Sequence, residues 1–186
     1  MSGRRYRIEP LNKAHDRAAF TCGEDAVDRY LKQSAGQDLR RGLAVTYVLA
    51  ESTTPDVIAG FYTLSASSVP LDTFPDETAR RLARYPNVPV ALIGRLATDI
   101  RYRGQHCGSR LLVDALIRIC TISETVIGVS AAVVDAKNED AARFYEHFGF
   151  TRFQHSVPPR LFIPLKTARA AVQPLLPKHS RVPTDI

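Results

Sequence analysis

One stretch of the chain, residues 90–120, constrains the fold more than any other. Val90–Thr98 is an apolar run rich in branched side chains, which predicts a buried strand. A basic loop with two glycines follows, and apolar residues then recur at helical spacing from Leu111 to Cys120. The sequence therefore places small residues at a helix N-terminus, where unpaired backbone N–H groups and the positive end of the helix dipole favour phosphate.

The candidates for this phosphate cradle surround the start of the predicted helix. Arg101 adds positive charge beside them. A glycine pair ahead of a helix is also found in ordinary loops, so this motif alone leaves both interpretations open. The cradle residues are Arg103, Gly104, Gln105, Gly108 and Ser109.

The remaining periodicity predicts alternating strands and helices, and hence a mixed α/β domain. We assign residues 1–166 to this domain and residues 167–186 to a C-terminal tail. The tail loses periodicity and has three prolines in its last thirteen positions, although Ala168–Leu176 also fits a short helix. The expected strands are Tyr6–Pro10, Ala44–Glu51, Val57–Ser65, Val126–Val134, Phe150–His155 and Arg160–Leu165, and the expected helices are Asp16–Leu39, Asp76–Arg84 and a short helix capped by Asn138 and ended by Gly149.

Charge and cysteine content narrow the classes of partner. The net charge of +6 and the pI of about 9.5 favour polyanions such as nucleic acid or a phosphate-rich cofactor. No apolar run approaches the ~20 residues of a membrane helix, and the N-terminus has no apolar signal region, so we expect a cytoplasmic protein that does not enter a membrane. Cys22, Cys107 and Cys120 are odd in number and form no CxxC pair, so we expect free thiols and no metal site.

A second candidate motif covers Asp135–Phe150. If the acyl donor is a thioester, transfer to an amine releases a thiolate, and a nearby hydroxyl can protonate it. Tyr145 is the candidate for this general acid. The same tyrosine also fits an aromatic core position on an amphipathic helix, and the motif by itself does not separate the two roles.

Together the two motifs resemble the GNAT superfamily of N-acetyltransferases. The loop 103–108 (RGQHCG) matches the pyrophosphate motif that follows the family's fourth strand, and Asn138, Ala141, Phe144–Tyr145 and Gly149–Phe150 match its next helix. The resemblance implies a mostly antiparallel, mixed central sheet flanked by helices, with a V-shaped splay between the fourth and fifth strands. It also implies acetyl-CoA as cofactor and Tyr145 as proton donor. The implied cofactor-binding residues are Leu96, Ala97, Thr98, Arg103, Gly104, Gln105, His106, Cys107, Gly108, Ser109 and Asn138.

The layout from Tyr6 to Lys166 is similar to the GNAT toxins of bacterial type II toxin–antitoxin systems. The matching segments are FTCG at 20–23, RRGLA at 40–44, TYV at 46–48, GFYTLSA at 60–66, GRLATD at 94–99 and RLFIPLK at 160–166. The resemblance implies acetylation of the α-amine of aminoacyl-tRNA, inhibition of translation and silencing by a ribbon-helix-helix antitoxin. We also expect a homodimer, because most soluble oligomers are symmetric dimers.

The chemistry and the charge agree with such a substrate. An α-amino group, with a pKa of about 7.7–8.0, needs little base catalysis compared with a lysine amine at about 10.4. The resemblance implies that a backbone N–H at Leu96–Thr98 donates to the thioester oxygen. Two basic clusters are candidates for tRNA phosphates, although they also fit solvated helix faces: Arg40, Arg41, Arg80, Arg81 and Arg84.

One residue departs from the family motif. His106 stands where the family has glycine, which permits close backbone approach and unusual φ. Its imidazole can bond a phosphate, point outward from the first turn, or crowd the cofactor.

The alternative functions are a GNAT enzyme that acetylates a small-molecule or protein amine and a binding module without activity.

Overall fold

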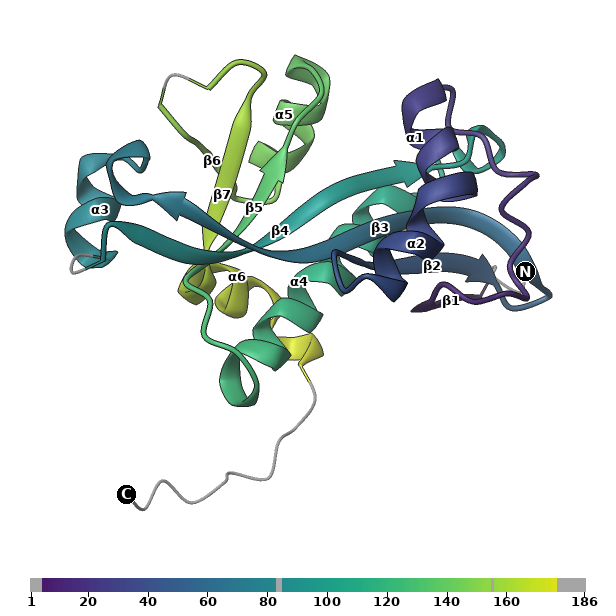
Figure 1. The fold of residues 1–186 in the computed structure, drawn as a ribbon, viewed down its shortest axis with the longest axis horizontal. Helices are drawn as coiled ribbons and strands as arrows, with labels where there is room; N and C mark the ends of the chain where they lie inside the picture. Colours follow the sequence, from purple (N-terminus) through teal and green to yellow (C-terminus); the bar gives the residue numbers. More distant parts are fainter. Residues whose placement is uncertain (1–4, 83–84, 155, 177–186) are drawn as a thin grey trace.

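The computed structural model describes residues 5–82, 85–154 and 156–176. Within them, strands form one seven-stranded sheet in the order β1-β2-β3-β4-β5-β7-β6 (Figure 1). Every neighbouring pair is antiparallel except β4 and β5, which run parallel, so the predicted mixed, mostly antiparallel sheet is confirmed. The strands are β1 Tyr6–Pro10, β2 Val45–Glu51, β3 Thr54–Pro70, β4 Asn87–Thr98, β5 Ala131–Asp135, β6 Thr151–Arg152 and β7 Arg160–Pro164.

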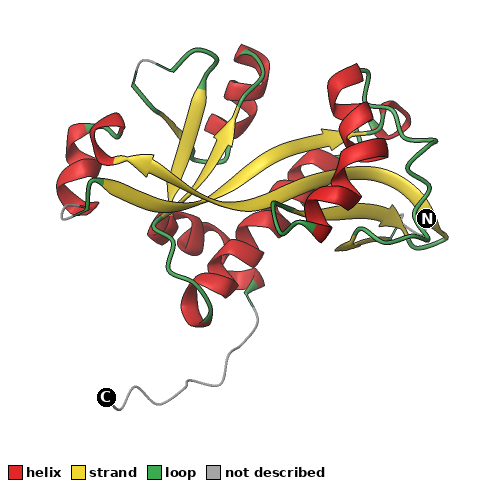
Figure 2. Ribbon diagram, viewed as in Figure 1, coloured by secondary structure: helices red, strands yellow, loops and turns green. Residues whose placement is uncertain are grey.

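Helices cover both faces of this sheet (Figure 2). Neighbouring residues of one strand, such as Val48 and Leu49 or Phe61 and Tyr62, belong to two different buried clusters, because successive side chains point to opposite faces. One cluster contains residues of α4 and α6. The other, which we call the α1 cluster, contains Tyr30, Leu31 and Ala35 from the helical segment that continues α1, and Val27 of α1 packs against it. The helices are α1 Asp25–Arg29, continued by the π-helical turn Tyr30–Ser34 into α2 Ala35–Arg40, then α3 Asp76–Leu82, α4 Cys107–Thr125, α5 Glu139–His147 and α6 Leu165–Val172, with 3-10 turns at Leu71–Thr73, Ile100–Tyr102 and Gln173–Leu175.

Several predicted boundaries were wrong. The strand predicted at Val57–Ser65 runs from Thr54 to Pro70. The first helix begins at Asp25 and not at Asp16, whose carboxylate accepts hydrogen bonds from the N–H groups of residues 18 and 19 and so stabilises a turn. The strand predicted at 126–134 is formed only by Ala131–Asp135, since Val126 still donates to a carbonyl of α4. The strand predicted at 150–155 shortens to Thr151–Arg152.

The packed part of the chain continues past residue 166, where we placed the domain boundary. Helix α6 crosses this position, and its Ala168 and Val172 are buried in the cluster that also contains α4. Residues 177–186 of the predicted tail lie outside the described residues. None of the helices that the structure describes is both long and apolar enough to cross a membrane.

Candidate active site

Strands β4 and β5 separate at one point of the sheet, and we call the resulting gap the splay. Their parallel pairing ends at Ile93 and Val134, whereas β4 continues to Thr98 beside β3 only. The two strands diverge visibly beyond this point (Figure 1). The predicted V-shaped splay is therefore present, and the backbone of Leu96–Thr98 lies along its open edge.

A cavity of about 310 Å³ lies where the splay meets the N-terminus of α4. Within the described part of the chain, the side chain of the boundary residue His106 does not cap this helix, whose N-terminus carries the positive end of the helix dipole and so favours a bound anion. Most residues predicted to bind the cofactor line the cavity, and Tyr102 and Phe144 join them. The lining residues are Thr98, Tyr102, Arg103, Gly104, His106, Cys107, Gly108, Ser109 and Phe144.

The other predicted cofactor residues lie around the cavity without lining it. Leu96 approaches Gly108, since a Cβ on that glycine would lie 3.9 Å from the Leu96 Cδ2. Ala97 points to the opposite face and packs against the α1 cluster. Gln105 accepts a hydrogen bond of 2.8 Å from the Tyr6 hydroxyl, and Asn138 caps α5 through the N–H of Ala141 at 2.9 Å. These two side chains are thus engaged in structural contacts.

His106 adopts the left-handed backbone conformation that the family's glycine permits, with φ of 56°. It is the N-terminal boundary residue of α4, and it is exposed at the mouth of the cavity. Histidine in place of glycine therefore preserves the backbone conformation of the loop and adds a side chain at the mouth of the cavity. A left-handed conformation costs a residue with a β-carbon roughly 1–2 kcal/mol.

We expect His106→Gly to raise the free energy of unfolding slightly, by at most about 1 kcal/mol. The substitution removes the left-handed strain, but glycine adds unfolded-state entropy that offsets part of the gain. His106→Val should instead destabilise the protein, because a β-branched residue fits this conformation worst. Denaturant unfolding of both variants checks the sign. Equal stabilities for the two variants would contradict the assignment.

A buried carboxylate that the sequence analysis missed anchors the loop after β4. Asp99 is fully buried and accepts bonds from the N–H of Thr21 at 3.1 Å and from the N–H, Nε and Nη2 of Arg101 at 2.8–2.9 Å. Burial disfavours its charged form, but these hydrogen bonds outweigh burial and hold the pKa of Asp99 below its usual value. The sequence feature that could have revealed Asp99 is a charged residue directly after an apolar strand.

The same loop is tied to the segment that leads into α1. Arg103 donates from Nη2 to the carbonyl oxygen of Cys22 at 2.9 Å, and Ile100 N donates to the carbonyl of Thr21 at 2.9 Å. Asp28 accepts from the Cys22 N–H and from the Thr21 hydroxyl, both at 2.8 Å. The segment at 20–23 and the loop at 103–108, the candidate phosphate loop, therefore form one connected unit.

Tyr145 projects from α5 into the buried cluster under the splay and is 7% exposed. Its ring contacts Phe144 and Phe150, with centroids 5.2 and 5.6 Å away. Among the described residues, none hydrogen-bonds its hydroxyl. Burial, assisted by the Asp135 carboxylate, raises the pKa of Tyr145 to about 12. The phenol therefore stays protonated near neutral pH, as a proton donor requires.

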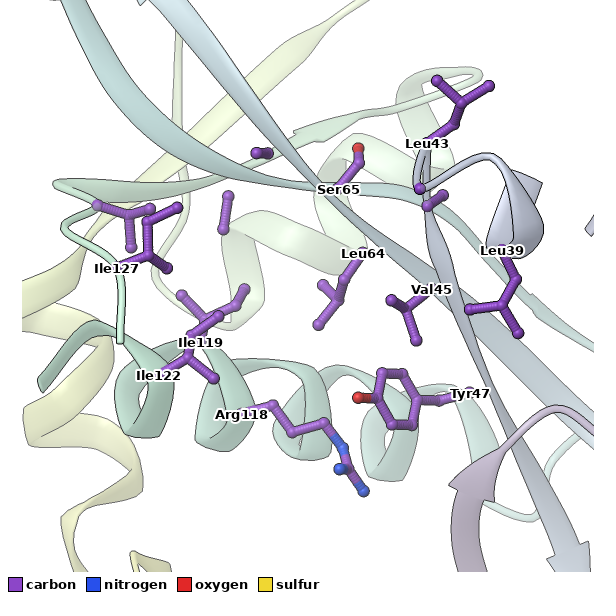
Figure 3. A pocket seen from close by; sticks show the side chains of 15 residues that line it. Leu39, Leu43, Val45, Tyr47, Leu64, Ser65, Arg118, Ile119, Ile122 and Ile127 are labelled. Atoms are coloured by element: carbon purple, nitrogen blue, oxygen red, sulfur yellow. The ribbon is translucent and has the colours of Figure 1, made fainter. Parts of the chain in front are cut away.

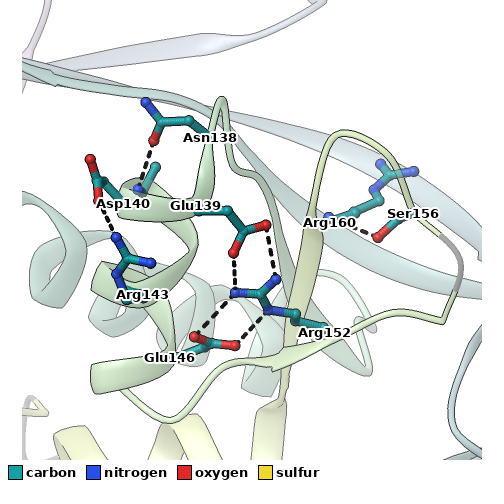
Figure 4. A network of polar contacts seen from close by, with 9 residues as sticks. Asn138, Glu139, Asp140, Arg143, Glu146, Arg152, Ser156 and Arg160 are labelled. Atoms are coloured by element: carbon teal, nitrogen blue, oxygen red, sulfur yellow. Dashed lines mark hydrogen bonds and ion pairs between the residues drawn. The ribbon is translucent and has the colours of Figure 1, made fainter.

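Ion pairs support α5 from outside (Figure 4). Arg152 on β6 bridges the first and last turns of the helix, with Nη2 2.8 Å from Glu139 Oε2 and Nε 2.6 Å from Glu146 Oε1. Hydrogen bonds to these two carboxylates raise the pKa of Arg152. Gly149 then ends the helix region with φ of 87°, as predicted. Both ends of the element that carries Tyr145 are thus held.

The arginines predicted to contact tRNA do not form one described surface. Arg40 and Arg41 are exposed at the end of α2, whereas Arg80 and Arg81 are exposed on α3, at the far end of the β3–β4 pair (Figure 1). Arg81 pairs with Glu77 at 2.6 Å. The fifth, Arg84, lies outside the described residues.

A second cavity, of about 350 Å³, lies between the middle of the sheet and the C-terminal half of α4 (Figure 3). Its walls are mostly apolar, with Leu43, Val45 and Ile127 exposed at its rim and Arg118 and Tyr47 on one side. None of the predicted cofactor or tRNA residues lines it. The predicted cofactor-binding and tRNA-binding residues therefore lie away from this second cavity.

Residues 44–152 match the model of the acetyltransferase (GNAT) domain. The match spans more than half of the chain and includes the splay, the phosphate loop and Tyr145. The chain belongs to the GNAT acetyltransferase family. It is accordingly an acyltransferase whose acetyl donor is acetyl-CoA.

Curated GNAT relatives cover almost the whole chain. A probable toxin TacT from Sinorhizobium fredii (strain NBRC 101917 / NGR234) is 33% identical over 171 residues, which are 88% of this chain and 93% of the relative. A tRNA-acetylating toxin from Mycobacterium tuberculosis (strain ATCC 25618 / H37Rv) is 33% identical over 162 residues, or 87% and 93% of the two chains. The resemblance to GNAT toxins is confirmed at the level of the whole domain.

Solved GNAT structures superpose on the chain over similar lengths. AtaT complexed with acetyl-methionyl-tRNAfMet gives a TM-score of 0.82 at 28% identity and covers 89% of this chain and 98% of that one. A mutant AtaT bound to the C-terminus of the antitoxin AtaR and acetyl-CoA gives 0.75 at 27% identity, with coverage of 91% and 99%. The fold is therefore shared with proteins that bind both acetyl-CoA and a charged tRNA.

Proposed function

We propose that this protein is the toxin of a type II toxin–antitoxin system, which acetylates the α-amine of aminoacyl-tRNA with acetyl-CoA and thereby inhibits translation. The observation that carries the proposal is the uncapped helix N-terminus beside the open edge of β4, in a chain 33% identical to a tRNA-acetylating toxin over 87% of its length. We also propose that the protein acts in the cytoplasm.

The cavity at α4 suits a diphosphate. The first N–H groups of α4 and the guanidinium of Arg103 provide donors and positive charge, and Gly104 and Gly108 leave room for phosphate oxygens near the backbone. Bound acetyl-CoA supplies the acetyl group as a thioester. Because Arg103 already donates to Cys22, its remaining N–H groups are those available to phosphate.

The chain's own groups then support transfer. At the ordinary pKa of about 7.7–8.0, roughly a tenth of the α-amine is neutral at pH 7, and the adjacent ester increases this fraction by lowering the pKa. The neutral amine forms the new bond to the acetyl carbon without a strong base. A backbone N–H on the open edge of Leu96–Thr98 donates to the thioester oxygen, where negative charge develops. As the C–S bond breaks, the Tyr145 hydroxyl would protonate the departing sulfur. The acylated nitrogen would lose one proton to solvent, and the Tyr145 phenolate would regain one from solvent, so that the proton count balances.

Transfer of labelled acetyl groups tests this function. Incubation of the protein with radiolabelled acetyl-CoA and a mixture of charged tRNAs should produce acetylated aminoacyl-tRNA, and the same tRNAs without amino acids should remain unlabelled. Separation by isoacceptor then identifies the substrate. If no charged tRNA from any isoacceptor becomes labelled, the proposed function is rejected.

A GNAT enzyme that acetylates a small-molecule or protein amine is the second candidate. The distance between α2 and α3 in the fold and the pairing of Arg81 with Glu77 favour it, because they weaken the case for one continuous tRNA surface. Reversal of Arg40, Arg41, Arg80 and Arg81 to glutamate distinguishes the two candidates. An enzyme for small amines should keep its turnover, whereas a tRNA-acetylating toxin should lose activity.

We propose a homodimer and a ribbon-helix-helix antitoxin as the protein's assemblies. Both rest on the similarity to GNAT toxins and on the prevalence of symmetric dimers. Light scattering measures the mass of the purified protein, and co-expression with the product of a neighbouring small gene tests the antitoxin. A monomeric mass at micromolar concentration would reject the dimer. Growth arrest that persists when the product of the neighbouring gene is co-expressed would reject that product as the antitoxin.

A further inference from the structure

Arg95 lies at the base of the splay, where β4 has just separated from β5. It is the second residue of β4 beyond the last paired position, Ile93, and the one charged residue in Asn87–Thr98. Its side chain is exposed although the strand is otherwise largely apolar. A charged side chain at this position lies beside the place where the acetyl donor and the amine meet during acetyl transfer.

The side chain of Arg95 points away from the acetyl donor's face. Leu96 and Thr98 both approach Gly108 at the N-terminus of α4, so they point to the face where the phosphate loop lies. Because successive side chains of a strand alternate, Arg95 and Ala97 point to the other face, and Ala97 packs there against the α1 cluster. A donor bound at α4 leaves this second face for the amine.

The guanidinium of Arg95 lies over the Tyr30 ring and, among the described residues, is not paired with an acid. Its Cζ lies 3.6 Å from the centroid of the Tyr30 ring, and the Tyr30 hydroxyl donates to Asp38 at 3.0 Å, which fixes the ring. Within residues 5–82, 85–154 and 156–176, no group forms an ion pair or hydrogen bond with this guanidinium. Arg101 and Arg118, by contrast, are paired with carboxylates. The N–H groups of Arg95 are oriented and available.

We propose that Arg95, held on Tyr30, forms a subsite for a phosphodiester in the single-stranded 3′ end of the tRNA substrate. The inference rests on the proposed function and specifies where that substrate binds. A planar guanidinium binds a phosphate through two parallel N–H···O bonds, and stacking on an aromatic ring orders it beforehand. In aminoacyl-tRNA an ester joins the amino acid to the last ribose. Its α-amine is therefore separated from the nearest phosphate by that ribose. Along β4, Arg95 is about 7 Å from Ala97 at the open edge.

Direct binding tests the subsite without acetyl transfer. The probe is an uncharged acceptor-stem RNA hairpin with a single-stranded CCA 3′ end, labelled at its 5′ end and followed by fluorescence anisotropy. Arg95→Gln should raise its Kd about 10- to 100-fold, the usual range for a charged hydrogen bond. It should also reduce the slope of log Kd against log salt concentration by about 0.7, the contribution of one single-strand phosphate. Arg95→Lys should keep the salt slope and lose part of the affinity.

Arg7→Gln is the matched control. It removes one positive charge from β1, at the far edge of the sheet, where Arg7 pairs with Glu9. Its Kd and salt slope should stay close to those of the unmodified protein. An unchanged Kd and salt slope for Arg95→Gln overturns the subsite even when acetyl transfer is intact. Binding losses in Arg95→Gln support the subsite even if no charged tRNA is acetylated, an outcome that rejects the proposed function alone.

Discussion

Replacement of Tyr145 by phenylalanine should lower kcat for acetyl transfer at least ~100-fold and leave the fold intact. Loss of a general acid commonly costs ~10²–10⁴ in rate. The phenylalanine ring keeps the contacts with Phe144 and Phe150. The KM for acetyl-CoA should change little, because the hydroxyl acts on the departing sulfur and not on the bound phosphates. Steady-state kinetics with saturating charged tRNA measure both constants.

Tyr47→Phe serves as a control for the loss of a phenolic hydroxyl. Tyr47 lies on β2, stacks on Tyr62 at 5.3 Å and lines the second cavity, so its variant should keep kcat. The pH profile offers a second check. The pKa of Tyr145 is raised to about 12, so its proton is retained throughout the neutral and moderately alkaline range. Activity should not decline between pH 8 and 10 through ionisation of this group. An unchanged kcat in the phenylalanine variant would assign Tyr145 to packing.

Asp99→Ala should destabilise the protein by about 3 kcal/mol, which corresponds to a fall in Tm of about 6–12 °C. The substitution leaves the partly buried N–H groups of Thr21 and Arg101 without their acceptor and releases the Arg101 guanidinium. The segment at 20–23 and the phosphate loop lose their common anchor, so the KM for acetyl-CoA should rise as well. Thermal unfolding and steady-state kinetics measure the two effects.

Asp140→Ala is the control for the loss of a carboxylate. Asp140 pairs with Arg143 on the surface of α5, and its removal should change stability by less than about 1 kcal/mol.

Because the folded pKa of Asp99 is lowered, its stabilisation is fully present above the unfolded pKa of about 3.9 and is lost as the pH falls through the folded value. The stability gap between the native protein and Asp99→Asn should therefore persist at pH 5–8 and narrow only below about pH 4. Equal stability at pH 7 would refute the anchoring role.

Local sequence patterns predicted most elements of the fold. The strand Tyr6–Pro10 has the predicted bounds, α4 follows the helical spacing of its apolar residues, and Asn138 caps α5 as expected. These features depend on contacts within a few residues. The predicted helix at Asp16–Leu39 began nine residues late, because the Asp16 side chain bonds nearby N–H groups and because residues 20–23 pack against the loop after β4. The spacing of apolar residues along the chain reveals neither of these two contacts.

The sequence by itself determined the family and the residues of the phosphate loop, since glycines, arginines and a helix start are adjacent along the chain. Tertiary structure decided what those residues face. It placed Asp99, Thr21 and Cys22 together across almost eighty positions, and it directed Arg95 to the face opposite the loop. It also gave His106 a left-handed φ. The reason is physical: local patterns record preferences of neighbouring residues, whereas burial, charge pairing and the parting of two strands depend on segments that meet only in the folded chain.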